Sequence, residues 1–379
     1  MSFPARRISL ILGLIFAFIS IWIYQQLELP APTGPYNVSR TMIRWVDTSR
    51  PEVLTEDPDD FREVVAVAWY PAEPETGVQG GYFPNLRTLS DELMRSGEVT
   101  LWEVLGLGLL RSSMLLDSDP VKEPFPVVIL SPGNGTNIEF YSILASEIAS
   151  HGYIVIGINH PYDVAAVELS DGEVAPYDKA QWALDTQAHQ AYTAERIKVR
   201  TADVLFALGR LDEMNSTGPF AGAMDLDAIA VAGHSLGGIT ASEACKVNER
   251  FKACLNLDGL QAGGPFSMDE TTLPPNQPFM FLTKEAQLHP RLLERFEAMT
   301  ESYWIVVHGA AHDSFTDGPM LQSALLPGSS QANRVMEVVQ KYSVAFLDHV
   351  LRGRSDEILS HPANKPGVSV RWFPSGRYK

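Results

Sequence analysis

Short apolar stretches alternate with amphipathic stretches along most of this sequence. After Pro126 the apolar runs have the length of single strands, and they lie at 127–131, 153–159, 228–233, 253–257, 278–283 and 303–308. Helical spacing of apolar positions predicts helices at 138–150, 185–214, 236–247, 290–299 and 333–351. Strands that alternate with helices predict an α/β fold, with a mostly parallel central sheet and helices on both of its faces.

The stretch before Pro126 departs from this alternation. Residues 36–47 and 61–70 predict an antiparallel pair of strands around a turn at Asp57–Asp60. A helical insertion at about 72–124 follows, and its apolar run at 101–110 continues through 114–116. That run is either a helix packed over the core or a lid that faces a membrane and borders an acyl pocket. We assign one domain to 36–352 and a C-terminal tail, with no predicted element, to 353–379.

The N-terminal segment predicts export. Residues 8–24 are 17 consecutive residues without a charge, and Arg6 and Arg7 precede them. A basic pair before an apolar segment is typical of a signal peptide or a single membrane anchor. Because no small-x-small cleavage motif precedes Gln25, an anchor that is kept is favoured. We therefore expect residues 1–24 to be a signal peptide or signal-anchor helix, 25–35 to be a linker, and the protein to be membrane-anchored, secreted or periplasmic.

Composition and charge narrow the partners. The chain is 45% hydrophobic and 20% charged, as expected for a globular protein, and its formal net charge is −17. Since no basic run follows the extreme N-terminus, nucleic-acid binding is not expected. The two cysteines, Cys245 and Cys254, are favoured to be buried free thiols, although an exported protein permits a disulfide.

The pentapeptide Gly233-His234-Ser235-Leu236-Gly237 stands between a predicted strand and a predicted helix. A G-x-S-x-G pattern in that setting is typical of a nucleophile elbow. The sharp turn that exposes the serine leaves no room for side chains at Gly233 and Gly237. Ser235 is therefore the candidate nucleophile, and His234 is expected to pack within the elbow.

Two further residues stand just past later strands, where functional residues gather in a parallel sheet. Asp258 follows the strand at 253–257, and His312 follows the strand at 303–308. The order Ser235, Asp258, His312 is that of the α/β-hydrolase triad, with His312 as general base and Asp258 as the group that orients it. The alternatives are His308 as the base and Glu285 or Asp313 as the acid.

An oxyanion hole needs two backbone N–H groups aimed at the developing negative charge. Leu236 supplies the first, as the residue after the nucleophile, and Asn134 in the loop 131–136 is the candidate for the second. No metal or cofactor is expected. His308 and His312 are four positions apart, but Gly309 disfavours the helix that such a zinc site needs, and no phosphate-binding G-x-x-x-x-G-K-[ST] loop is present.

These motifs resemble those of the platelet-activating factor acetylhydrolase family, of the secreted, lipoprotein-associated phospholipase A2 type, over roughly residues 60–350. Gly-His-Ser-x-Gly-Gly at 233–238 is similar to the family's nucleophile motif, Leu257-Asp258 to its acid and His312-x-x-Phe315-x-Asp317 to its base motif. The stretch 141–155 resembles the family's helix and strand after the oxyanion loop, which bacterial polyester hydrolases and other esterases share. Ser131-Pro132-Gly133 departs from the family's Ser-His-Gly.

The resemblance implies a metal-independent serine ester hydrolase that acts through an acyl-enzyme on phospholipids with short or oxidised sn-2 acyl chains. The expected partners are an ester or phospholipid substrate and a membrane, which residues 8–24 and 101–116 would contact. The alternatives are a general carboxylesterase, lipase or polyesterase of the same fold, a peptidase, and a membrane-tethered binding protein with a degenerate site.

Overall fold

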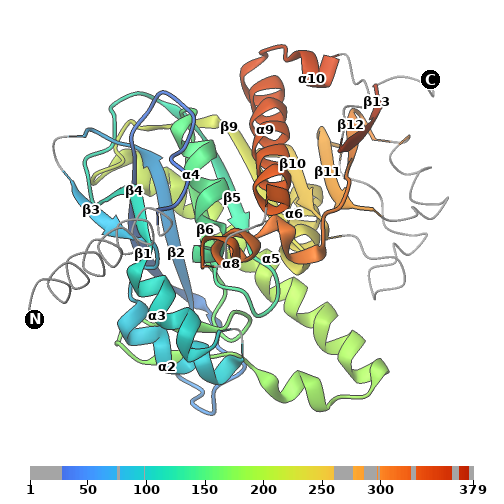
Figure 1. Cartoon of the computed structure of the whole chain (residues 1–379). Helices are drawn as coiled ribbons and strands as arrows, with labels where there is room; N and C mark the ends of the chain where they lie inside the picture. The colour runs from blue at the N-terminus through green and yellow to red at the C-terminus, as the bar shows by residue number, and fades with distance from the viewer. Residues whose placement is uncertain are drawn as a thin grey trace, which may run out of the picture.

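Figure 1 shows the computed structural model of this chain, which describes residues 28–74, 77–97, 99–259, 276–285, 297, 299–325, 330–360 and 367–374. The apolar segment predicted at 8–24 and nearly all of the helix predicted at 290–299 lie outside these residues. Among the described helices, none combines the length and the apolar character that crossing a bilayer requires.

One sheet of 11 strands, in the order β13-β12-β11-β10-β9-β5-β6-β2-β1-β4-β3, organises the described residues. Its strands are β1 (Val38–Pro51), β2 (Phe61–Pro71), β3 (Val78–Gly81), β4 (Arg111–Leu116), β5 (Phe125–Ser131), β6 (Ile154–Asn159), β9 (Met224–His234), β10 (Phe251–Leu257), β11 (Phe279–Lys284), β12 (Ser302–Val307) and β13 (Val368–Phe373). A separate hairpin pairs β7 (Ala166–Glu168) with β8 (Val174–Pro176).

The central strands, from β6 through β5, β9, β10 and β11 to β12, run parallel to their neighbours. The pairs β1–β2, β2–β6, β3–β4 and β12–β13 are antiparallel. The predicted α/β fold with a mostly parallel sheet is confirmed, as is the antiparallel pair that the sequence predicted on either side of Asp57–Asp60.

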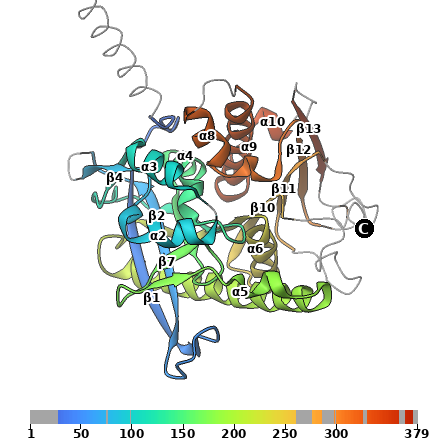
Figure 2. The same cartoon turned by 60° about the horizontal axis from the view of Figure 1, so that its bottom comes forward.

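Helices cover both faces of the sheet. They are α2 (Leu86–Ser96), α3 (Leu101–Leu109), α4 (Ser142–Ser150), α5 (Thr186–Ser216), α6 (Leu236–Val247), α8 (Gly318–Leu325), α9 (Ser330–Arg352) and α10 (Glu357–Ser360), with 3₁₀ turns η1 (Ile138–Tyr141), η2 (Lys179–Ala183) and η3 (His312–Phe315). Figure 2 shows α4, α8 and α9 on one side of the sheet, and α5 and α6 on the other.

Strand β9 shows why both faces are covered. Ile229 and Val231 pack into the apolar cluster beneath α5 and α6, whereas Ala230 and Ala232 pack into the cluster beneath α4 and α9. All four side chains are buried. Alternate residues of a strand point to opposite faces, so the stretch 229–232, which has no polar residue, needs a helical layer on each side.

The structure corrects the interpretation of the apolar run in the insertion as one continuous element. Helix α3 ends at Leu109, and Arg111–Leu116 forms strand β4, which pairs with β3 and briefly with β1. Ser112 and Met114 are buried while Ser113 between them is exposed, which is the two-residue period of a strand.

The stretch 353–379, for which the sequence predicted no element, contributes helix α10 and strand β13. Strand β13 pairs antiparallel with β12, covers its outer side and forms one edge of the sheet. Val368 and Val370 are buried, and Arg371 places its guanidinium 5.0 Å from the ring centroid of Trp304. The only sequence signal for β13 was an alternation of apolar and polar residues over the six positions Val368–Phe373.

Candidate active site

The elbow occupies the end of β9. Ser235 has φ 53° and ψ −122°, a strained conformation for a residue with a side chain, and it separates β9 from α6. A Cβ at Gly233 would overlap the backbone of Gly237, and one at Gly237 would overlap the carbonyl oxygens of Ser131 and Pro132. The strand, the helix and the loop after β5 therefore approach one another at positions where only glycine fits.

The structure brings Ser235, His312 and Asp258 together from three strand ends. Nε2 of His312 lies 2.8 Å from Oγ of Ser235, and Nδ1 of His312 lies 2.6 Å from Oδ2 of Asp258. A carboxylate only accepts hydrogen bonds, so Nδ1 carries the proton and Nε2 is free to accept from the serine hydroxyl. This arrangement can remove the hydroxyl proton as the oxygen attacks a carbonyl carbon.

Asp258 is buried at the carboxyl end of β10, and its other oxygen has a partner that the sequence analysis missed. The hydroxyl of Thr283, at the end of neighbouring β11, donates to Oδ1 across 2.6 Å. Burial by itself raises the pKa of Asp258, but the hydrogen bonds from His312 and Thr283 bring that pKa below its usual value. The carboxylate is thus held ionised beside the imidazole.

The alternative base and acids lie in other contacts. His308 places Nδ1 2.6 Å from Glu285 and Nε2 2.7 Å from the hydroxyl of Ser369 on β13. The carbonyl oxygen of Asp313 accepts from Thr316, inside the turn that follows His312. The carboxylate that bonds His312 is therefore Asp258.

The loop after β5 presents Asn134 beside the elbow. The N–H of Gly133 donates to the hydroxyl of Tyr141 across 2.9 Å, and the N–H of Gly135 donates to the carbonyl of Asp163 across 2.8 Å. Among the described residues, neither the N–H of Asn134 nor that of Leu236 has a protein acceptor. These two predicted donors are available to an oxyanion.

Asn134 is itself held from the side by a group of polar and aromatic residues. Its Nδ2 lies 2.9 Å from the hydroxyl of Tyr177 and 3.1 Å from Oε1 of Gln181. The next residue, Trp182, stacks on His189 with ring centroids 5.8 Å apart and remains 65% exposed. An apolar ring therefore stands on the surface near the loop that carries Asn134.

A buried polar network supports the same loop from below. Ser131 Oγ lies 2.9 Å from Nε2 of His160, and Nδ1 of His160 lies 2.8 Å from Oδ2 of Asp203. Arg200 donates to the carbonyl of Pro132. Burial and the charge of Arg200 lower the pKa of His160 to about 4, so its imidazole is neutral. This second Ser–His–Asp sequence is fully buried, so it is a structural support out of reach of substrate.

His234 packs within the elbow, as predicted, and also makes two polar contacts. Its Nδ1 lies 2.8 Å from the hydroxyl of Tyr141, and its Nε2 lies 3.0 Å from the carbonyl oxygen of His312. Burial and the neighbouring His312 lower the pKa of His234 to about 3, so this ring is also neutral.

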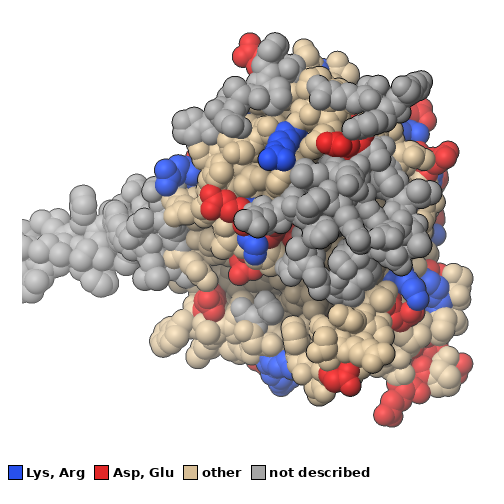
Figure 3. Space-filling model, turned by 90° about the vertical axis from the view of Figure 1, so that its right-hand side faces the viewer, with Lys and Arg blue, Asp and Glu red and all other residues tan. Residues whose placement is uncertain are grey.

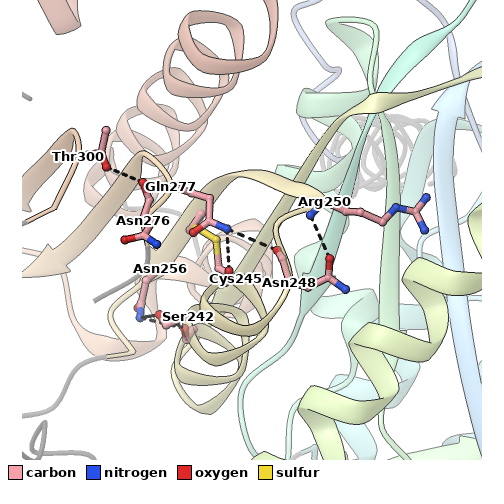
Figure 4. Close-up of a disulfide and its surroundings, with 10 residues drawn as sticks. Ser242, Cys245, Asn248, Arg250, Asn256, Asn276, Gln277 and Thr300 are labelled. Atoms are coloured by element: carbon pink, nitrogen blue, oxygen red, sulfur yellow. Dashed lines mark hydrogen bonds between the residues drawn. A yellow bond between two sulfur atoms is a disulfide. The ribbon is translucent and has the colours of Figure 1, made fainter. Parts of the chain in front are cut away.

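The cysteines differ from the favoured prediction of free thiols. Cys245 on α6 and Cys254 on β10 form a disulfide, with their Cα atoms 6.2 Å apart. Figure 4 shows the bond between this helix and this strand, with Gln277 donating to the carbonyl of Cys245 across 2.8 Å. The two cysteines are nine positions apart in the sequence, and this spacing alone does not show that α6 packs beside β10.

Helix α3 presents an apolar face to solvent. On α3 the residues Leu101, Trp102, Leu105 and Leu109 are 55%, 79%, 52% and 63% exposed.

Charged side chains of both signs lie interspersed among the described residues on the face drawn in Figure 3. Within the described residues, no group of three or more His, Cys, Asp or Glu side chains is arranged to hold a metal ion.

Comparison with known proteins places the chain among esterases. The protein family described as "Platelet-activating factor acetylhydrolase, isoform II" matches residues 25–358. An Arthroderma benhamiae protein named "Probable 1-alkyl-2-acetylglycerophosphocholine esterase" is 24% identical over 396 aligned residues, which cover 94% of this chain and 97% of that protein. The Cavia porcellus "Platelet-activating factor acetylhydrolase" is 26% identical over 360 residues, covering 85% of this chain and 78% of its own.

A solved structure is similar over a comparable length. The ferulic acid esterase from Streptomyces cinnamoneus matches with a TM-score of 0.72 and 25% identity, covering 90% of this chain and 98% of the other. The two structures therefore share most of their fold.

Proposed function

This chain belongs to the platelet-activating factor acetylhydrolase isoform II family and is a carboxylic ester hydrolase, and on that premise we propose that Ser235 is its nucleophile. In this proposal His312 is the general base and Asp258 orients it. The observation that carries the assignment is the pair of short hydrogen bonds that His312 makes: Nε2 accepts from Ser235 across 2.8 Å, and Nδ1 donates to Asp258 across 2.6 Å.

The proposed reaction has two halves. Oγ of Ser235 attacks the ester carbonyl carbon while its proton passes to Nε2 of His312. The tetrahedral intermediate collapses, the C–O bond to the alcohol breaks, and the alcohol leaves with the proton from Nε2. Water, deprotonated by the same nitrogen, then attacks the acyl-enzyme, and the second collapse releases the acid and returns the proton to Ser235.

The N–H groups of Leu236 and Asn134 are proposed to stabilise the oxyanion in both halves. The occupied N–H groups on either side of Asn134, at Gly133 and Gly135, support this choice because they fix the direction of the loop. Losing one such donor typically costs ~3 kcal/mol of transition-state stabilisation. Asp258 stabilises the imidazolium that forms when His312 takes the proton.

Phospholipids with short or oxidised sn-2 acyl chains are the proposed substrates. The names of two relatives denote an acetylhydrolase of platelet-activating factor and an esterase of 1-alkyl-2-acetylglycerophosphocholine. The exposed apolar face of α3 supports contact with a lipid surface, because large apolar side chains gathered on one helix favour partition into an interface. Export of the protein, and anchoring through residues 8–24, stay predictions from the sequence.

A general esterase acting on other carboxylic esters is the second candidate. The similar solved structure is a ferulic acid esterase, so the same fold at this level of likeness accommodates an aromatic acid ester. The exposed Trp182 near the oxyanion loop supports this candidate, since an aromatic acyl group could stack on it.

The test compares the wild-type protein with Ser235→Ala on four substrates: a short-sn-2-acyl phospholipid, a long-chain phospholipid, p-nitrophenyl butyrate and methyl ferulate. Selective hydrolysis of the short-acyl phospholipid supports the proposal, and hydrolysis of the simple esters alone supports the second candidate. The variant should lose at least ~10⁴-fold in kcat and keep the wild-type melting temperature. Wild-type protein that hydrolyses none of them and resists a fluorophosphonate serine probe would contradict the assignment and revive an inactive binding protein.

A further inference from the structure

One hydrogen-bond chain runs from the oxyanion loop to the loop that carries His312, through residues with no role in the proposed reaction. It begins at the peptide unit that joins Pro132 to Gly133. Arg200 donates to the carbonyl oxygen of this peptide, and the peptide N–H donates to the hydroxyl of Tyr141 across 2.9 Å. Both polar groups of the peptide are therefore fixed, which sets the orientation of the next N–H, that of Asn134.

From Tyr141 the chain continues through His234. The hydroxyl of Tyr141 lies 2.8 Å from Nδ1 of His234, and Nε2 of His234 lies 3.0 Å from the carbonyl oxygen of His312. A carbonyl oxygen only accepts, so Nε2 carries the imidazole proton, and Nδ1 of the neutral ring accepts from Tyr141. Every proton in the chain thus has one direction.

Solvent cannot replace these contacts. Tyr141 and Arg200 are 0% exposed and His234 is 3% exposed. The ring of His234 is also held by packing, with its centroid 6.0 Å from that of Phe315 and 4.8 Å from that of His312. A buried polar group that loses its partner here has no water to turn to, so the loops that it connects must shift.

We propose that Tyr141 and His234 are positioning residues. They hold the oxyanion loop (131–136) and the loop that carries His312 in a fixed position relative to each other. The proposal rests on the proposed function, in which the N–H of Asn134 and Nε2 of His312 act on the same substrate carbonyl. Since the reaction needs both groups aligned at once, a relative shift of the loops weakens the transition state more than the bound substrate. We call the hydrogen bonds from Gly133 through Tyr141 and His234 to the carbonyl of His312 the relay. Disrupting the relay should therefore lower kcat far more than it changes KM.

The first experiment replaces Tyr141 by Phe. We expect kcat on p-nitrophenyl butyrate to fall about tenfold, the size associated with one lost hydrogen bond whose partners stay buried, while KM changes less than about twofold. Tyr153→Phe is the matched control, because Tyr153 is equally buried and its hydroxyl donates to Asp348 across 2.6 Å, away from the site. A Tyr141→Phe variant with wild-type kcat would overturn the proposal.

Two substitutions at His234 separate its contacts. Asn can place an acceptor near the position of Nδ1, and Gln can place a donor near the position of Nε2, so each preserves one side of the relay. We expect both variants to lose about tenfold in kcat, and the double variant Tyr141→Phe/His234→Gln to lose no more than about threefold beyond the worse single variant. Losses that multiply in the double variant would show independent packing effects and overturn the coupling.

Hydrogen exchange tests the coupling without any substrate. In Tyr141→Phe, peptides that cover residues 131–136 and peptides that cover 308–317 should both exchange faster than in the wild type and in Tyr153→Phe. Faster exchange confined to 131–136 would overturn the proposal even if the protein is active. A wild-type protein without esterase activity would contradict the proposed function alone, since this exchange pattern does not depend on turnover.

Discussion

The hydroxyl of Tyr82 lies 2.8 Å from Oδ2 of Asp317 and so joins the insertion before β5 to the loop that carries His312. The same carboxylate accepts from the N–H of Ile143 in α4 across 3.1 Å, and the N–H of Asp317 donates to the carbonyl of Phe140 across 2.7 Å. Burial raises the pKa of Asp317 to about 7, although the hydrogen bonds from Tyr82 and Ile143 oppose this. Through the hydrogen bond from Tyr82 to Asp317, the insertion helps to hold the loop that carries His312.

We expect Tyr82→Phe to lower the free energy of unfolding by ~1–3 kcal/mol, and by more above neutral pH than below it. Without its hydroxyl donor, the pKa of Asp317 rises further, so the variant keeps a proton that the wild-type protein releases as pH passes about 7. The stability difference should therefore grow from about pH 5.5 to about pH 8.5, as measured by urea unfolding.

Tyr70→Phe provides the control for this prediction. The hydroxyl of Tyr70 is also buried, but it donates to the backbone carbonyl of Ser118 across 2.8 Å, which does not titrate. Its substitution should lower stability by a similar or smaller amount that does not depend on pH. Parallel pH curves for the wild type and Tyr82→Phe would refute the role given to Asp317.

Thr283→Val should reduce kcat about tenfold with little change in KM. Valine keeps the shape of threonine but removes the hydroxyl that donates to Asp258 across 2.6 Å, and the carboxylate then holds His312 less firmly. Steady-state hydrolysis of p-nitrophenyl butyrate measures the change. Thr201→Val is the control, since the hydroxyl of Thr201 is buried without a partner among the described residues. Equal activity of the two variants would contradict this role.

The elbow and the triad residues could be predicted from the sequence, because each is marked by residue types that are close together along the chain. The elbow at Ser235 needs a strand, small residues and a helix in direct succession, and all three are visible in the residue types. Asp258 and His312 could be proposed because each directly follows a strand of a parallel sheet, and the carboxyl ends of such strands share one edge. Thr283 lies one residue before the end of neighbouring β11 and could have been found by the same rule.

The supporting residues could not be predicted, because their contacts join distant segments. Tyr141 precedes α4 and contacts His234, which lies 93 positions later in the sequence, and Asp203 contacts His160 from the middle of α5. Each of these residues, taken locally, looks like an ordinary helix or strand residue. The Cys245–Cys254 pairing and the short strand β13 likewise depend on which elements the fold places side by side.

Replacing both cysteines, Cys245→Ala/Cys254→Ala, should lower the free energy of unfolding by ~3 kcal/mol. A cross-link that closes a loop of about ten residues restricts the unfolded chain by roughly this amount. Urea unfolding of the variant, and of the wild type with and without reductant, measures the effect. Thiol titration of the wild-type protein, native and then denatured without reductant, should find no free thiol. Two reactive thiols would contradict the disulfide.

Acid should destabilise the fold through its buried neutral histidines. Burial and the charge of Arg200 lower the pKa of His160 to about 4, and burial with the neighbouring His312 lowers that of His234 to about 3. In the unfolded chain, histidine binds a proton below about pH 6.5. The unfolded state therefore binds more protons than the folded state as pH falls from about 6.5 to about 4, and stability falls by ~1.4 kcal/mol per pH unit for each histidine.

His160→Gln isolates one of these contributions. At about pH 8, where the imidazole is neutral in both states, the variant differs from the wild type only by its altered contacts to Ser131 and Asp203. Between about pH 6.5 and pH 4.5 the free energy of unfolding of the variant should fall less steeply than that of the wild type. The two slopes should differ by ~1.4 kcal/mol per pH unit, the contribution of one proton. Because ionised carboxylates contribute to both curves, the difference between the two urea-unfolding series reports His160. Series that stay parallel from pH 8 to pH 4.5 would show that His160 is charged in the folded protein, against the buried contacts that hold it neutral.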